Sequence, residues 1–273
     1  MPGRRGASPA SSWRRSSGRA DGADFGHRFP VWETVPVTES PALVIFDLDG
    51  TLVDPAGSIT SGIAFALESH GLPVPDATTL GSMVGPPLLE SLRRLADVPE
   101  EALPAVVHAY RRRYISHGMA ASRPYPGIPE LLAQLREEGL HLAVATQKPQ
   151  SLAEKLLTLH GLDRHFHSIH GAPDDETLPP APDGKAGIVR AALTTNHTDA
   201  SRAVMVGDRR HDAHGAAANG IPCIGVRWGF APAGELEALA LVGIVDDAAA
   251  LRVAIAAVLS RQTAGTAAET AAC

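Results

Sequence analysis

Short apolar runs of strand length recur along the chain, separated by longer segments in which apolar residues recur with the period of a helix. The runs are Ala42–Phe46, Leu142–Ala145, Ala203–Val206 and Ile221–Val226. Because each run is apolar throughout instead of alternating with polar residues, each is consistent with a strand buried on both faces of a sheet. Such strands are typical of the interior of a parallel sheet.

Amphipathic helices are expected between these strands. The segment Ile128–Glu138 has apolar residues at the i, i+3, i+4, i+7 spacing of one helix face, and Gly139 follows as a stop. Three further segments have helical patterns: Ser151–Leu159, Lys185–Leu193 and His211–Asn219. Strands that alternate with helices predict an α/β fold, a doubly wound, Rossmann-like parallel sheet with helices on both faces and right-handed crossovers.

One interval interrupts this alternation. Between Pro55 and Pro124 there is no convincing strand, but helices are expected at Ile59–Ser69, Leu88–Leu95 and Leu103–His117. An interval of about 70 residues is too long for a single crossover helix and long enough for a small folded unit. We therefore expect an α-helical subdomain inserted after the first strand.

Length and charge narrow the classes of function. At roughly 150 residues per domain, 273 residues correspond to about 1.8 domains, which one domain with a smaller insert satisfies. The net charge is −6, yet residues 1–40 hold six Arg against four acids, so the remainder carries −8. Bulk charge of this sign does not attract a phosphate backbone, so a nucleic acid is not expected as a bound partner. There is also no apolar run of about 18 residues, so no ordinary membrane span is expected.

The cysteine content favours a reducing compartment. Cys223 and Cys273 are the two cysteines, and there is no CxxC spacing. Neither a disulfide framework nor a zinc ribbon is therefore implied. A cytoplasmic location fits best, and the sequence leaves the oligomeric state open.

Both ends of the chain are expected to lack a fold of their own. Residues 1–20 contain five Arg, five Ser and no acid, with no apolar segment that would complete a signal peptide. A disordered extension, or a start codon assigned too early, is the favoured interpretation, and targeting or docking is the alternative. The Ala- and Thr-rich segment from Arg261 to Cys273 is expected to be a flexible tail.

The most informative segment follows the first apolar run. There Asp47 and Asp49 precede Gly50, at the place where the strand is expected to end. Ligands of open α/β sheets lie beyond the carboxyl ends of the strands, and a carboxylate there can attack phosphorus to form an aspartyl-phosphate. The alternative is an ordinary turn, since Asp and Gly are common turn residues.

A second acidic pair follows a later strand. Asp208 stands directly after the run that ends in Gly207, and Asp212 lies one helical turn further on. Carboxylates that converge in this way repel one another unless a hard cation lies between them, and oxygen-only ligands favour Mg²⁺. The alternatives are a helix N-cap for Asp208 and a helix-dipole partner for Asp212, and the alternative suits Asp212 better.

A phosphoryl group also needs hydroxyl and cationic donors. Thr146 stands just past an apolar run and could bond a phosphate oxygen, and Lys185 opens a predicted helix. A Lys at a helix N-terminus is poorly placed for the helix dipole, so a nearby anion is expected to compensate it. Taken singly, a capping Thr and a solvated Lys are the more common explanations.

Together, in chain order, these pieces resemble the haloacid dehalogenase superfamily of aspartate-nucleophile phosphohydrolases. Asp47-Leu-Asp49-Gly-Thr51 resembles its first motif, Thr146 its second, Lys185 its third, and Gly207-Asp208 with Asp212 its fourth. The resemblance spans about residues 41–250 and implies a catalytic core over 41–54 and 125–260 with a helical cap over 55–124. The segments outside it are the N-terminal extension over 1–40 and the C-terminal tail over 261–273.

The resemblance also implies roles for these residues. Asp47 would be the nucleophile and Asp49 the general acid and base, while Thr146 and Lys185 would bind the phosphate. Mg²⁺ would be held by the Asp47 carboxylate, the Asp49 backbone carbonyl and the Asp208 carboxylate. Asp212 would orient the metal site or Lys185 from outside the ligand shell.

The helical insert is similar to the cap of the first type in this superfamily. Within it, Val84-Gly-Pro-Pro-Leu88 resembles the substrate loop of phosphoglycolate-phosphatase-like and 5′-nucleotidase-like members, or is simply a rigid turn between helices. The chain departs from its relatives at Pro55, at Gln147 and in the long Pro-rich loop before Lys185.

These resemblances imply a Mg²⁺-dependent phosphatase that hydrolyses a small phosphate monoester, with a small phosphorylated metabolite as its partner. Two alternatives remain open, namely a phosphosugar mutase of the same superfamily and a non-catalytic regulatory or binding module. The presence of both Asp47 and Asp49 argues against the module.

Overall fold

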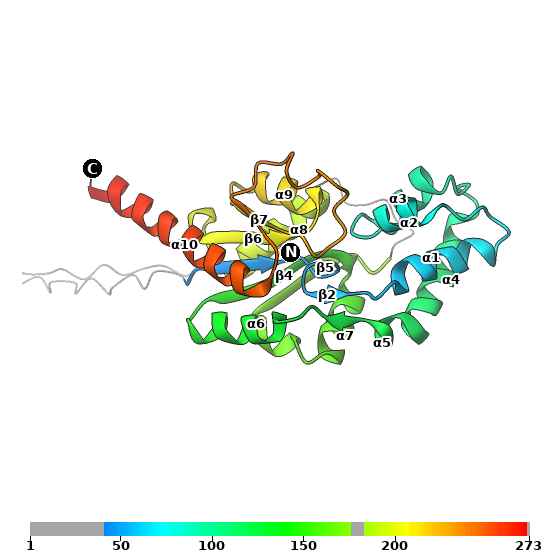
Figure 1. Cartoon of the computed structure of the whole chain (residues 1–273), viewed down its shortest axis with the longest axis horizontal. Coiled ribbons are helices and arrows are strands. Elements are labelled where there is room, and N and C mark those ends of the chain that lie inside the picture. Colours follow the sequence, from blue (N-terminus) through cyan, green and yellow to red (C-terminus); the bar gives the residue numbers. More distant parts are fainter. Residues whose placement is uncertain (1–40, 176–182, 272–273) are drawn as a thin grey trace, which may run out of the picture. The chain divides into compact units, whose positions relative to one another are not determined.

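A six-stranded parallel sheet forms the centre of the fold (Figure 1). The computed structural model describes residues 41–175 and 183–271. The strands lie in the order β5 (Ser168–Ala172), β4 (His141–Pro149), β1 (Leu43–Phe46), β6 (Ala203–Gly207), β7 (Cys223–Val226) and β8 (Gly243–Val245). This arrangement confirms the predicted α/β class. The extension predicted over residues 1–40 lies outside the described residues.

Side chains of the central strand β1 alternate between two apolar layers. Leu43 and Ile45 pack in one layer with α8 (Gly184–Thr195) and α9 (Arg210–Ala217). Val44 and Phe46 pack in the other. The helices of this second layer are α6 (Ile128–Glu137), α7 (Gln150–Leu159) and α10 (Ala248–Ala271). Because helices cover both faces, the inner strands β1, β6 and β7 are apolar throughout.

The predicted helical insertion is confirmed. It leaves the core after β1 and returns at β3 (Arg123–Pro124), which pairs antiparallel with β2 (Val53–Asp54). Its helices are α1 (Ser58–Glu68), α2 (Ala77–Ser82), α3 (Leu88–Leu95), α4 (Leu103–Arg113), a π-helical turn (Tyr114–Gly118) and α5 (Met119–Ala121). Helices α1 to α4 group together, apart from the strands of the large sheet (Figure 1). We call residues 55–124 the cap.

Two features differ from the sequence predictions. Strands β5 and β8, at the two edges of the sheet, are only partly buried and were not among the predicted strands. Strand β5 carries polar Ser168 and His170, whereas β8 ends an apolar run, residues 238–245, that the sequence prediction did not include. The tail expected over 261–273 is helical as far as Ala271, where α10 ends, and its flexibility stays a prediction. Extending an existing helix through an Ala-rich segment is favourable, since Ala has the highest helix propensity and no new nucleus is needed.

No helix in residues 41–175 and 183–271 is both long enough and apolar enough to cross a membrane.

Candidate active site

The carboxyl ends of three neighbouring strands bring the predicted polar residues together. Strand β1 lies between the parallel strands β4 and β6, so Asp47, Thr146 and Asp208 lie close together at the carboxyl-terminal ends of these strands. Lys185, in the first turn of α8, reaches the same end of the sheet. All four side chains are buried, although such groups are normally solvated. Buried polar groups of this kind need partners that compensate for their lost hydration.

Lys185 is the cation at the centre of this cluster. Its Nζ lies 2.6 Å from Asp47 Oδ1 and 2.7 Å from Asp212 Oδ1. Burial by itself lowers the pKa of the ammonium, but the carboxylates of Asp212 and Asp47 outweigh this and raise the pKa above its ordinary value. Lys185 therefore remains charged and orients both carboxylates.

Asp208 is held by two donors from distant parts of the chain. The Thr51 hydroxyl donates to Oδ1 over 3.3 Å, and the backbone N–H of Phe230 donates to Oδ2 over 2.7 Å. Burial raises the pKa of the Asp208 carboxyl, and the charges of Asp212 and Asp47 raise it further. The side chain is thus fixed in place while its charge is only partly compensated.

Asp212 caps the helix that follows β6. Its Oδ2 accepts the backbone N–H of Arg209 over 3.1 Å, in a capping box at the start of α9. Burial raises the pKa of its carboxyl to about 6, although the Lys185 ammonium opposes that rise. The same carboxylate thus fulfils the helix-capping role that the sequence offered as the alternative and also contacts Lys185.

Two glycines allow these carboxylates to approach the backbone. Gly50 has φ +88, and a Cβ there would lie 2.3 Å from Asp208 Oδ2. A Cβ on Gly207 would lie 2.3 Å from Asp212 Cβ. No side chain fits at these distances, so the cluster depends on glycine at both positions.

The carboxylates of Asp47, Asp208 and Asp212 fit a divalent cation. Their oxygens lie within 4.8 Å of one another, and all three residues are buried. Lys185 supplies one positive charge near them. An all-oxygen site with excess negative charge suits a hard cation such as Mg²⁺. This set contains Asp212, to which the sequence assigned only an orienting role, and the described contacts do not test the predicted Asp49 carbonyl ligand.

The carboxylate of Asp49 faces away from Lys185 and pairs with a different lysine. Lys148 Nζ donates to Asp49 Oδ2 over 2.6 Å and lies 4.6 Å from the ring centre of Tyr114 in the cap. Burial by itself lowers the pKa of the Lys148 ammonium, but the nearby Asp49 carboxylate outweighs this effect and raises the pKa above its ordinary value. Within the described residues, the buried Asp49 Oδ1 has no hydrogen-bond partner.

Lys148 is the residue that the sequence analysis missed. It stands two residues after Thr146, whose Oγ1 accepts the backbone N–H of Lys148 over 3.2 Å. A signal was present, since Lys148 follows closely after Thr146, which the sequence indicated as a phosphate-binding residue. Its ion pair with Asp49, however, joins two residues that are 99 positions apart in sequence.

Comparison with known proteins agrees with this geometry. The sequence profile of the family described as haloacid dehalogenase-like hydrolase matches residues 44–226. The chain belongs to this family. The match runs from β1 to β7 and so includes all the residues of the acidic cluster together with the cap.

Named relatives in this family differ in their activities. Tyrosine-protein kinase PtkA of Mycobacterium tuberculosis is 43% identical over 199 residues, which cover 73% of this chain and 66% of PtkA, slightly less than two thirds of its length. A 5′-nucleotidase of Pseudomonas aeruginosa is 39% identical, covering 77% of this chain and 93% of that protein. A phosphoglycolate phosphatase of Agrobacterium fabrum is 36% identical, covering 78% of this chain and 91% of that protein.

A solved structure shows the same fold. The crystal structure of a predicted phosphatase from Clostridium acetobutylicum superposes with a TM-score of 0.72 at 34% identity, covering 79% of this chain and 98% of that one.

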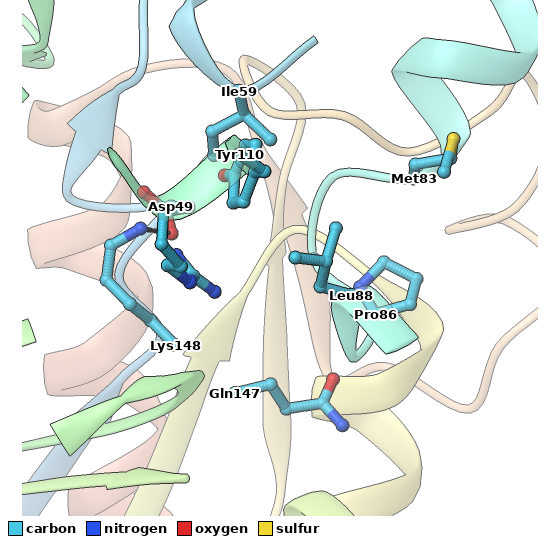
Figure 2. A pocket seen from close by; sticks show the side chains of 10 residues that line it. Asp49, Ile59, Met83, Pro86, Leu88, Tyr110, Gln147 and Lys148 are labelled. Carbon is cyan, nitrogen blue, oxygen red and sulfur yellow. Dashed lines mark hydrogen bonds and ion pairs between the residues drawn. The ribbon is translucent and has the colours of Figure 1, made fainter. Parts of the chain in front are cut away.

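A pocket lies beside Asp49 between the haloacid dehalogenase-like core and its cap. It encloses about 40 Å³, room for a few water-sized groups. Figure 2 shows the Lys148 side chain reaching toward Asp49, with Pro86 and Leu88 of the cap across the pocket. The lining residues are Asp49, Gln147 and Lys148 from the core, and Ile59, Met83, Gly85, Pro86, Leu88, Tyr110 and Arg111 from the cap.

Proposed function

We propose that this protein is a Mg²⁺-dependent phosphatase that hydrolyses a small phosphate monoester through an aspartyl-phosphate intermediate. The observation that carries the proposal is the buried Asp47 carboxylate, 2.6 Å from Lys185 Nζ and grouped with Asp208 and Asp212 at the carboxyl edge of the sheet. Relatives named 5′-nucleotidase and phosphoglycolate phosphatase support the reaction class.

The first step would transfer the phosphoryl group to the protein. An Asp47 carboxylate oxygen attacks phosphorus, the bond from phosphorus to the ester oxygen breaks, and the departing oxygen takes a proton from the Asp49 carboxyl. Thr146 and Lys185 bind the phosphoryl oxygens and stabilise the charge that develops on them. Asp49 is suited to the proton transfer because it lines the pocket that would hold the leaving group.

The second step would regenerate the protein. Asp49, now a carboxylate, takes a proton from water, the water oxygen attacks phosphorus, and the bond between phosphorus and Asp47 breaks. Inorganic phosphate leaves. Asp47, Asp208 and Asp212 would hold the Mg²⁺ ion, and the bound ion supplies positive charge that offsets the negative charge of the phosphoryl group.

The cap would favour small substrates. The pocket beside Asp49 encloses about 40 Å³, and Pro86 and Leu88 on the cap lie opposite Lys148. A cap that closes over such a pocket during turnover would exclude water and restrict the leaving group. Phosphoglycolate-like esters and nucleoside 5′-monophosphates are the two classes that the named relatives suggest, and larger esters would need the cap to open.

The test is release of inorganic phosphate from a panel of small phosphate esters, with Mg²⁺ and with EDTA. Asp47→Asn keeps the size of the side chain and should abolish turnover. Turnover that persists in EDTA, or in Asp47→Asn, contradicts the proposal. Movement of phosphate from one sugar hydroxyl to another, without release, selects the phosphosugar mutase.

The similarity to PtkA supports a second candidate function, which is transfer of a phosphoryl group from ATP to a protein tyrosine. PtkA is 43% identical over 199 residues, more than either phosphatase described above. Incubation with Mg²⁺, ATP and a tyrosine-containing peptide tests it. Phosphate that appears on the peptide favours the kinase, whereas free phosphate alone favours the phosphatase.

A further inference from the structure

Arg209 is a buried residue that the proposed chemistry does not use. It lies between Asp208 and Asp212 in sequence, but its side chain is only 2% exposed and extends to the cap. An arginine is almost never buried without partners that satisfy its charge and its donors. The partners of Arg209 therefore indicate what it does.

Those partners belong to two different parts of the molecule. On the core side, Arg209 Nε lies 3.0 Å from Glu235 Oε1, which also accepts the backbone N–H of Arg210 over 3.0 Å. On the cap side, an Arg209 terminal nitrogen donates to the backbone carbonyl of Val84. A guanidinium held by a carboxylate thus presents a charged donor to the cap.

The cap segment that Arg209 contacts is the Val84–Leu88 loop. Gly85 in this loop has φ +102, and a Cβ there would lie 3.3 Å from Arg209 Cγ, so the backbone packs directly on the arginine stem. Three residues of the loop, Gly85, Pro86 and Leu88, line the pocket beside Asp49 (Figure 2). The loop is therefore fixed on one side by Arg209 and faces the leaving-group space on the other.

We propose that Arg209 is a positioning residue that fastens the Val84–Leu88 loop over the pocket and thereby sets the affinity for the organic part of the substrate. The predicted change in substrate affinity rests on the proposed phosphatase activity, whereas the predicted fastening of the loop by Arg209 does not. Loss of the contact removes a hydrogen bond that ties the loop to the core, while Asp47 and Lys185 keep their partners. The effect should therefore fall on KM and not on kcat.

The test compares Arg209→Met with Arg210→Met in the full chain. Arg210 also pairs with Glu235, at 3.0 Å, but its side chain is 50% exposed and makes no described contact with the cap. Hydrogen exchange of the Val84, Gly85 and Leu88 amides should become faster in Arg209→Met and stay unchanged in Arg210→Met. For a small phosphate ester, KM should rise about tenfold in Arg209→Met, the size expected for a charge-assisted hydrogen bond, with kcat and the half-saturating Mg²⁺ concentration unchanged.

A second variant covers the case in which Arg209→Met does not fold. Arg209→Lys keeps the charge beside Glu235, but one ammonium lacks the fork that reaches both partners, so exchange and KM should change in the same direction by less. Unchanged exchange of the loop in the folded variants overturns the proposal. So does a fall in kcat and in Mg²⁺ affinity at constant KM, because that places Arg209 in support of Asp208 and Asp212. A wild-type protein without phosphatase activity refutes the proposed function, while the exchange measurement still decides the role of Arg209.

Discussion

Two buried ion pairs give Asp47 and Asp49 different surroundings. Asp47 shares the ammonium of Lys185 with Asp212, while Asp49 faces Lys148 and the cap. Neighbouring carboxylates can hold different roles when their surroundings differ, and here each has its own lysine. The environment of each carboxylate is therefore set by a residue far away in sequence.

Replacing Lys148 by Met should destabilise the fold. The change leaves the Asp49 carboxylate buried without its ammonium, which costs about 3 kcal/mol or more in comparable buried pairs. Urea denaturation measures the loss. The control is Arg252→Met, because Arg252 pairs with Glu138 at the surface and its side chain is 49% exposed. A similar loss in both variants contradicts the assignment of a buried, structurally coupled Lys148–Asp49 pair.

Replacing Gly50 by Ala should remove Mg²⁺-dependent activity. The new Cβ would lie 2.3 Å from Asp208 Oδ2 and force that carboxylate to move. Gly57→Ala is the matched control, because Gly57 also has a positive φ, +74, but nothing lies within 4 Å of a Cβ there. Both variants carry backbone strain, so they are distinguished by the contacts of the new Cβ at position 50 with Asp208 and with Phe230, whose backbone N–H holds Asp208. Equal activity, measured as phosphate release across a Mg²⁺ titration, would count against a role for Asp208 at the site.

Site residues that directly follow a predicted strand could be identified from the sequence. Site residues whose role depends on contacts between distant segments could not. Asp47 and Asp208 follow apolar runs directly, so the sequence places them at the edge of a sheet. Lys148 pairs with Asp49 and Arg209 with Glu235, both far away in sequence, and each also contacts a cap residue, Tyr114 or Val84. No local pattern encodes such a contact between segments far apart in the chain.

Among the elements, the C-terminal helix is the one whose extent the sequence underestimated. Leu251 and Ile255 of α10 are fully buried in the apolar layer that contains Val44 and Phe46 of β1. The sequence analysis considered only the Ala- and Thr-rich end and expected a loose tail there. It therefore missed that an anchored helix precedes this end and continues through it to Ala271.

Truncating a buried side chain of α10 should lower the stability of the protein if this helix packs against the sheet. Ile255→Ala leaves a cavity in the layer beneath the sheet and should lower the free energy of unfolding by about 3 kcal/mol, within the usual range for such changes. Val253→Ala on the same helix is the control, since Val253 is 68% exposed and should have little effect. Chemical denaturation compares the two. Comparable small effects would mean that α10 does not pack as described.

For the molecule as a whole, the alternation of strands and helices was sufficient to predict the fold class and the insertion. Four buried runs became β1, β4, β6 and β7, because strands covered on both faces are apolar throughout. The edge strand β5 has one neighbour in the sheet and is half-buried, so it mixes polar and apolar residues and its pattern is weak. The other edge strand, β8, ends the apolar run of residues 238–245, so a signal for it was present in the sequence.

If the acidic cluster holds Mg²⁺ as proposed, the stability of the protein should depend on both pH and the metal. Burial raises the pKa of Asp212 from 3.8 to about 6, so the metal-free fold favours the protonated carboxyl and loses stability as pH rises from about 4 through about 6. Binding of Mg²⁺ needs the ionised carboxylates and offsets their repulsion. Thermal unfolding should therefore show a larger increase in Tm with Mg²⁺ at about pH 8 than at about pH 5. The same increase at both pH values, or its persistence in Asp208→Asn, contradicts this prediction.

The most direct test of the central proposal asks whether Asp47 carries the phosphoryl group during turnover. Borohydride reduces an acyl phosphate to an alcohol, so quenching the reaction with borohydride and sequencing the peptides by mass spectrometry should find homoserine at position 47. This product should require both substrate and Mg²⁺ and should be absent at Asp49. Sustained phosphate release with Asp47 unmodified, or homoserine at another aspartate, would contradict the proposal.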